Sequence, residues 1–263
     1  MAVSGETLLL VLKSGYFRRI EMAVDKVLTN RKEVMALGYF TSGVPPFVVL
    51  KLELDQIDSL VRSSEQKLQE RAAELGLISL CAYFEAFSKN LFSAMANICP
   101  RILSNFAARR PHVSVEIDEL LNFVDKAEVK LGHLLAEKYD FGSAKAINSL
   151  YFDLLDITPF SKADSKKYSD LLNDRNLLVH HGGVYTIKYV KQRFEKADVA
   201  RMAHWDSLVV SKEHYLSWSS FIRRVAAKMA FAGHRALERF VSAQAVVLNE
   251  EQKKAIWYLA WDD

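Results

Sequence analysis

The chain has 263 residues, of which 50% are hydrophobic and 25% are charged. This composition is typical of a soluble globular protein and excludes an extended disordered chain. Ten glycines and five prolines are about half the usual share of these turn-forming residues, which favours a helical protein. The 35 basic and 32 acidic residues give a net charge of +3, so the overall charge does not by itself indicate nucleic acid binding.

Cysteine usage and hydropathy predict a cytoplasmic protein. Cys81 and Cys99 lie in apolar helical sequence without the spacing of zinc ligands, and we interpret both as core thiols in a reducing compartment. The apolar run Leu8–Leu12 is too short for the core of a signal peptide. The longest uncharged stretch, 34–50, contains two glycines and two consecutive prolines, which would break a membrane helix. We therefore expect no membrane segment.

The first 52 residues are interpreted as a helical extension that ends in a strand-like segment. Helical spacing predicts a helix from about Tyr16 to Leu37, and the glycines and prolines that follow would end it. The residues Phe47–Leu50, with the sequence Phe-Val-Val-Leu, predict a short strand.

Residues 53–245 are interpreted as a helical domain. The stretch Glu53–Ile98 has the spacing of one long helix or of two stacked helices, and Pro100 would end it. Capping and breaking residues separate the other expected helices, which cover 116–138, 143–156, 164–181 and 211–245. Gly182 and Gly183 would end the helix 164–181, because glycine adopts the left-handed conformation that a helix end favours.

Two further segments complete the chain. Val184–Val190 is rich in β-branched and aromatic residues and predicts a strand, which could pair with Phe47–Leu50. The tail, 246–263, contains Trp257, Tyr258 and Trp261 and is too apolar to be left in water. The sequence as a whole predicts a mainly α fold with an N-terminal extension and at most a small two-stranded β element.

The apolar arc of the helix 164–181 contains an arginine. A helical wheel groups four residues into this arc, with Leu177 opposite: Leu171, Leu172, Leu178 and Val179. Arg175 falls inside the arc, and because a guanidinium cannot lose its charge, its burial requires a carboxylate, a phosphate or several acceptors. We therefore expect Arg175 to bind an anion; the alternative is a structural ion pair.

A polar stripe flanks the same arc. Asn173, Asn176 and His180 follow one another at the spacing of helical turns and share a face. His180 and His181 both lie in the last turn of the helix, where they either act on a ligand or only complement the helix dipole.

An acidic residue interrupts the apolar face of the earlier long helix. Glu85 falls at the edge of this face, and a buried glutamate is costly unless it is paired. We therefore predict that Glu85 reaches Arg175 or a neighbouring asparagine and joins the two helices. The alternative is that Glu85 skirts the core with its carboxylate in water.

The segment Arg175–His180 resembles the Arg-x4-6-His motif of the HEPN superfamily, which often begins Arg-Asn, as it does here. The segment Tyr83–Phe87, with Glu85 in an aromatic-rich core sequence, is also similar, and the resemblance covers about residues 53–245. Within the superfamily, the chain resembles RiboL-PSP-like and abortive-infection HEPN proteins. The resemblance implies a HEPN-like helical bundle with the activity of a metal-independent endoribonuclease, working as a homodimer in a toxin–antitoxin or anti-phage system.

The resemblance also implies residue roles. Arg175 and His180 would be the catalytic pair, with Asn176, Glu85 and His181 in support, and neither a metal nor another cofactor would be needed. The ribose 2′-hydroxyl would attack the phosphate and leave a 2′,3′-cyclic phosphate. Some HEPN toxins carry a modified tyrosine two residues after the motif histidine, whereas this chain has Gly182 there, which argues against that mode of regulation.

The geometry of one helix favours a dimeric site. His180 lies five positions after Arg175, which places the two side chains about 140° apart on an ideal helix. One helix therefore cannot easily aim both at one phosphate, whereas two symmetry-related helix ends could supply both groups.

Basic residues near the motif and on the last helix are candidates for RNA contacts, since phosphates dominate nucleic acid affinity. The candidates are Lys188, Arg224, Lys228, Arg235 and Arg239. The alternative, for Lys188 as for the other four, is a solvated basic face that serves solubility.

Two other functions stay open. One is a non-catalytic HEPN module that binds RNA or a nucleotide, or that scaffolds a defence complex with an antitoxin or another partner protein. The other is a helical interaction protein in which Arg175 only neutralises Glu85. The sequence lacks a Gly-rich phosphate loop, a Gly-x-Ser-x-Gly elbow and a His-Glu-x-x-His motif, which argues against P-loop enzymes, serine hydrolases and zincins.

Overall fold

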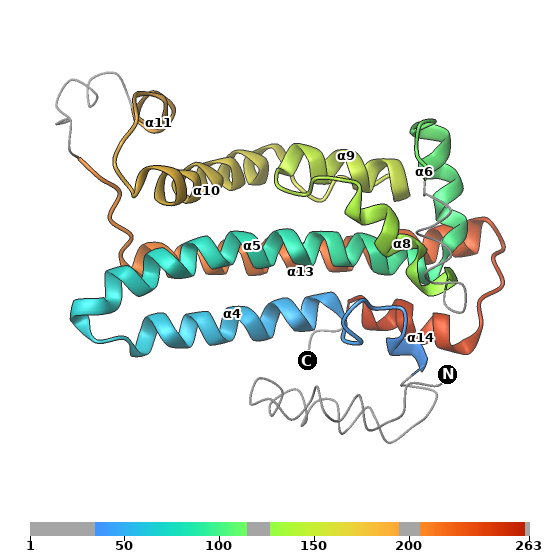
Figure 1. Cartoon of the computed structure of the whole chain (residues 1–263). Helices are drawn as coiled ribbons and strands as arrows, with labels where there is room; N and C mark the ends of the chain where they lie inside the picture. The colour runs from blue at the N-terminus through green and yellow to red at the C-terminus, as the bar shows by residue number, and fades with distance from the viewer. Residues whose placement is uncertain (1–34, 115–126, 195–205, 261–263) are drawn as a thin grey trace.

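The computed structural model describes residues 35–114, 127–194 and 206–260, and these residues form a mainly α fold (Figure 1). The helices are α4 (Pro46–Ser63), α5 (Gln66–Ile98), the 3-10 helix η1 (Pro100–Ile102), α6 (Leu103–Arg109), α8 (Ala127–Glu137), α9 (Ala144–Leu155), α10 (Lys162–His181), α11 (Ile187–Arg193), α13 (Lys212–Ala243) and α14 (Glu250–Tyr258). None of these described helices is both long and apolar enough to cross a bilayer.

The mainly α prediction is confirmed, and the expected helices 143–156, 164–181 and 211–245 are present with ends within two residues of those expected. The expected helix 116–138 is present in its described part as α8. Of the expected helix 16–37, only residues 35–37 are described, and they are helical.

The predicted strand Phe47–Leu50 is wrong, because these residues form the first turn of α4. A proline in the first turn of a helix is well tolerated, since its missing N–H would have no partner there, and Pro46 begins α4. Phe47, Leu50 and Leu54 then fall on one face of the helix and are buried. Helical burial therefore outweighs the β propensity of the two valines, and α4 runs without a break through residues 52 and 53.

The predicted strand Val184–Val190 is also wrong, because α11 covers Ile187–Arg193. Thr186 caps this helix, accepting a hydrogen bond from the backbone N–H of Tyr189 at its Oγ1. In the described residues, extended pairing is limited to one isolated antiparallel bridge between Val184 and Ser207, so the two-stranded element is absent there.

Helix α5 forms the centre of the fold and packs against α4, α8, α10 and α13. Figure 1 shows α4, α5 and α13 running side by side, with α9 and α10 on the other side of α5. Aromatic rings fill the space between α5 and these two helices: Phe84 packs on Tyr168 of α10 at 5.2 Å, and Phe92 packs on Tyr151 of α9 at 6.0 Å. The core is therefore continuous from α4 through α5 to the helix that carries the Arg175–His180 segment.

A partly buried polar cluster fixes α13 on α4. The carboxylate of Asp58 accepts hydrogen bonds from Tyr215 (2.7 Å), Ser219 (2.8 Å) and Arg223 (3.0 Å). These three donors lie on one face of α13, so the cluster sets the rotation of α13 about its axis.

The aromatic tail folds back on the end of α5. Asn249 and Gln252 form a capping box at the start of α14, and Nε2 of Gln252 donates to the carbonyl of Ile98 at 2.8 Å. Tyr258 and Leu259 are buried, whereas Trp257 is exposed.

The closest approach of α8 to α5 needs a glycine. A Cβ at Gly132 would overlap the carbonyl oxygen of Ser93 and lie 2.8 Å from the Cβ of Ala96, and the N–H of Gly132 donates to Asn97 Oδ1 at 2.7 Å. Backbone atoms and a short methyl group cannot move aside as the end of a flexible side chain can.

We predict that Gly132→Ala lowers the free energy of unfolding by about 2 kcal/mol, because overpacking outweighs the gain of about 1 kcal/mol in helix propensity. Chemical denaturation would measure this change. The matched control is Gly233→Ala on α13, where the added Cβ meets only the end of Met95, and we expect little change there. Equal stability of the two variants would contradict the prediction.

Candidate functional site between α10 and α11

A pocket of about 240 Å³ lies between the end of α10 and α11. The side chains that line it are Asn173, Asn176, Leu177, His180, His181, Thr186, Lys188, Tyr189 and Gln192. We call it the α10/α11 pocket. The polar stripe Asn173, Asn176 and His180 forms its wall on α10, as the spacing predicts. The lining contains two histidines and a lysine but no carboxylate, so it suits an anionic or hydrogen-bonding ligand.

The local sequence explains why the two helices meet here. Gly182 and Gly183 have φ values of +58° and +85°, which are the left-handed conformations expected from the glycine pair. The N–H of Gly183 donates to the carbonyl of Leu177 at 3.1 Å, and the chain then turns back. Four residues later α11 begins, so its first two turns lie against the last turns of α10.

Arg175 does not line the pocket. Its side chain is half-buried, and Nη1 donates to Oδ1 of Asn176 at 2.9 Å. Asn176 itself lines the pocket, so it connects Arg175 to the wall that carries His180. The structure thus places Arg175 and His180 on different sides of α10, as their separation of five residues predicts.

The predicted contact between Glu85 and Arg175 is not formed in the described part of the chain. The carboxylate of Glu85 instead lies toward the loop before α9, where Oε2 is 3.8 Å from the position that a Cβ at Gly142 would take. Glu85 is half-buried, which agrees with the alternative that it skirts the core. The buried face of α10 also differs from the expected apolar arc, since Leu177 is buried and Val179 is 47% exposed.

The guanidinium of Arg175 affects the α5 core through its charge. Burial raises the pKa of the Cys81 thiol to about 12, and the positive charge of Arg175 opposes that rise. Burial also raises the pKa of Tyr168, whose hydroxyl has no hydrogen-bond partner among the described residues. Both cysteines are buried and unpaired, which confirms the expected core thiols.

Sequence reasoning missed the most buried charged residue of this region, Asp174. Its side chain is 0% exposed, and its carboxylate accepts hydrogen bonds from Tyr189 Oη at 2.8 Å and from Arg193 Nη2 at 3.2 Å. His214 Nε2 of α13 lies 3.6 Å away. Burial, then the charge of Asp174, raise the pKa of Tyr189 well above its usual value, so this phenol stays protonated and donates.

A signal for Asp174 was present in the sequence. Tyr168, Leu171, Asp174 and Leu177 are spaced by three residues, and all four are buried. The helical wheel placed Leu177 opposite the expected apolar arc, so these four residues were not recognised as one buried face of the helix.

The predicted RNA-contacting residues do not form one surface with the pocket. Lys188 lines it, whereas Arg224 and Lys228 bind Asp164 of α10 at 2.8 Å and 3.1 Å. Arg235 stacks on Phe231 at 5.6 Å, and both Arg235 and Arg239 are exposed. Arg235 follows His214 by 21 residues on one helix, so it lies about 30 Å from the pocket end of α13.

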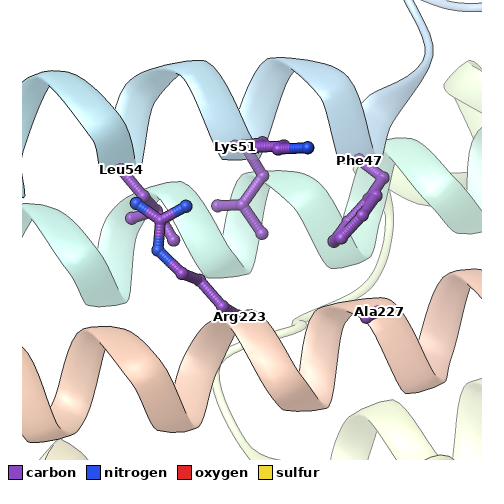
Figure 2. A pocket seen from close by; sticks show the side chains of 6 residues that line it. Phe47, Lys51, Leu54, Arg223 and Ala227 are labelled. Carbon is purple, nitrogen blue, oxygen red and sulfur yellow. The ribbon is translucent and has the colours of Figure 1, made fainter. Parts of the chain in front are cut away.

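A second hollow, of about 340 Å³, lies between α4 and α13 (Figure 2). Its lining is mainly apolar, with Lys51 and Arg223 as the charged residues: Phe47, Leu50, Lys51, Leu54, Arg223 and Ala227. Figure 2 shows Arg223 reaching from α13 toward α4, where Nη2 binds Asp55 at 2.8 Å and Asp58 at 3.0 Å. No histidine is among these lining residues, in contrast to the α10/α11 pocket, which has His180 and His181.

Comparisons of this chain with protein-family models, curated proteins and solved structures give no significant match. The resemblance to HEPN proteins therefore rests on the residues named above.

Asp164 offers a test of its ion pairs with Arg224 and Lys228 of α13. Burial opposes ionisation of this carboxyl, but hydrogen bonds from Arg224, Ser161 and Lys228 outweigh it and hold the pKa well below its ordinary value. A lowered pKa in the folded state means that the stabilisation is complete above the ordinary value of about 3.9 and is lost as the pH falls below it.

We predict that Asp164→Asn lowers the free energy of unfolding at pH 7 by about 2 kcal/mol. The difference from the unsubstituted protein should narrow as the pH falls below about 4, which denaturation at a series of pH values would show. Asp156→Asn is the control, because the Asp156 pair with Arg109 is largely exposed and should contribute little. A pH-independent difference for Asp164→Asn would contradict the prediction.

Proposed function

We propose that this protein is a metal-independent endoribonuclease of the HEPN type. The observation that carries the proposal is the α10/α11 pocket, because it gathers His180, His181 and Lys188 at the end of the helix that bears the Arg-x4-His segment. The proposed fold is accordingly a HEPN-like bundle. The proposed setting is cytoplasmic, as a toxin or anti-phage defence effector.

The residues have the chemistry that RNA cleavage without a metal requires. The reaction needs a base for the 2′-hydroxyl proton, an acid for the leaving 5′-oxygen and a cation for the extra charge on phosphorus. Histidine can transfer protons near neutral pH, which assigns this work to His180. Arg175 would stabilise the charged phosphorane, and Lys188 would attract the RNA backbone. The bond from Arg175 to Asn176 supports a positioning role for the asparagine.

A homodimer would bring Arg175 and His180 to one phosphate. Within one chain they lie on different sides of α10, and only His180 lines the pocket. Apolar side chains lie exposed around the pocket: Val179 is 47% and Ile187 is 77% exposed. Pairing of two copies across this region would cover these side chains and place an Arg175 of one copy near a His180 of the other.

The second candidate function is a non-catalytic module that binds RNA or a nucleotide. The position of Arg175 outside the pocket favours it, because a single chain can then bind a phosphate without completing a catalytic pair. The third candidate, an interaction protein in which Arg175 neutralises Glu85, has less support, because no direct ion pair joins the two side chains in the described part of the chain.

We predict that the purified protein cleaves RNA in the presence of EDTA and leaves 2′,3′-cyclic phosphate and 5′-hydroxyl ends. His180→Ala should lower the rate by at least about a hundredfold, because proton transfer by a positioned side chain contributes this much. End-labelled RNA and mapping of the product ends would measure both. The matched control is His112→Ala, since His112 is exposed and lies outside the pocket lining.

Three outcomes separate the candidates. Cleavage that is lost in His180→Ala and kept in His112→Ala supports the enzyme. RNA binding without cleavage by a dimer verified by sedimentation supports the binding module. Cleavage that survives His180→Ala would refute the assigned site.

A further inference from the structure

The short helix α11 supplies one wall of the α10/α11 pocket but has few means of holding its own position. It has seven residues, and a helix this short is unstable in isolation. Thr186, Lys188, Tyr189 and Gln192 from this segment line the pocket. Whatever fixes α11 on the bundle therefore also shapes the pocket.

Asp174 provides the polar attachment of α11. Its two hydrogen-bond donors, Tyr189 and Arg193, lie one turn apart on α11. Nε2 of His214 on α13, which accepts a hydrogen bond from Trp218 Nε1, lies 3.6 Å from Oδ2 of Asp174. A fully buried carboxylate is stable when its oxygens are hydrogen-bonded and its charge is paired, as they are here. Asp174 is thus the point at which α10, α11 and α13 meet.

The bond from Tyr189 also sets the rotation of α11. Tyr189 is buried, its ring stacks on Tyr185 at 5.4 Å, and its hydroxyl is fixed on Asp174 Oδ1 at 2.8 Å. Lys188 is the preceding residue, and Gln192 follows Lys188 by one turn on the same face. With Tyr189 fixed, these two side chains line the pocket together with His180 of α10.

We propose that Asp174 is a positioning residue, which acts through Tyr189 to hold α11 so that Lys188 lies over the pocket wall that carries His180. Asp174 does not line the pocket, so it touches no RNA and takes no part in proton transfer. The inference rests on the proposed function, because it assigns Lys188 to the RNA backbone.

The main variant is Tyr189→Phe, which keeps the ring packing and removes only the hydroxyl that binds Asp174. Asp174→Asn is the second variant, and it keeps the shape of the side chain while removing its charge. Asp170→Asn is the matched control, because Asp170 binds Arg193 at 3.3 Å without binding Tyr189. All three are made in the full chain.

Two measurements report separately on the stability of α11 and on binding at the pocket. Hydrogen exchange reports how often the amides of α11 open. Binding of a mixed-sequence 2′-O-methyl RNA oligonucleotide, which 2′ attack cannot cleave, reports the pocket. We expect Tyr189→Phe to speed exchange in α11 about tenfold and to weaken oligonucleotide binding about fivefold. The effects of Asp174→Asn should be at least as large. Asp170→Asn should stay within about twofold of the unsubstituted protein in both measurements.

A double-mutant cycle distinguishes positioning from a general structural effect. If Tyr189 acts by placing Lys188, then Tyr189→Phe combined with Lys188→Ala should bind the oligonucleotide no more than about twofold more weakly than Lys188→Ala alone. Additive losses would mean that the tyrosine does not work through the lysine, and would overturn the proposal.

The other outcomes of these experiments also test the proposal. Unchanged exchange in Tyr189→Phe would show that Asp174 does not hold α11. Faster exchange in α11 with unchanged oligonucleotide binding would overturn the positioning role of Asp174. The proposed function would still stand in that case if the unsubstituted protein cleaves RNA. If the unsubstituted protein neither binds nor cleaves RNA, the proposed function itself fails, and this inference fails with it.

Discussion

The apolar surface of α5 is the constraint on which the rest of the structure depends. This helix has 33 residues, and most of its second half is buried. In the described residues α4, α8, α10, α13 and α14 pack against it, and each must therefore turn an apolar face toward it. The packing is tight enough that a glycine, Gly132, is needed where α8 crosses. The location of α10, and so of the candidate site, follows from the rings of Phe84 and Tyr168 that join it to α5.

Charged residues then set the rotation of each helix around this core. Among the described residues, four aspartates face α13 from other helices: Asp55 and Asp58 from α4, and Asp164 and Asp174 from α10. Arg224 and Lys228 of α13 are used in the pair with Asp164. These two cations therefore pair with a carboxylate of the protein itself, although both side chains remain exposed.

Features that depend on neighbouring residues were predictable from the sequence. The turn at Gly182 and Gly183 and the stripe of Asn173 and His180 follow from backbone conformation and helical spacing. The two strand predictions failed because the valines near Phe47 and Val184 were judged by local β propensity, which tertiary packing overrides. Asp174 was missed because its partners lie 15, 19 and 40 residues away. Such contacts depend on how helices are rotated, and the rotation of α10 was mispredicted at Leu177.

The two thiols of α5 provide reporters that require no added cysteine. Only the thiolate reacts with thiol reagents, and each unit of raised pKa lowers its population about tenfold. With a pKa of about 12, Cys81 is chemically silent while α5 and α10 stay together. Cys99 caps the far end of the same helix and is also buried. The rate at which a thiol reagent modifies Cys81 would therefore report how often the helices beside Arg175 separate. The rate at which it modifies Cys99 would report, independently, how often the end of the bundle that contacts the tail opens.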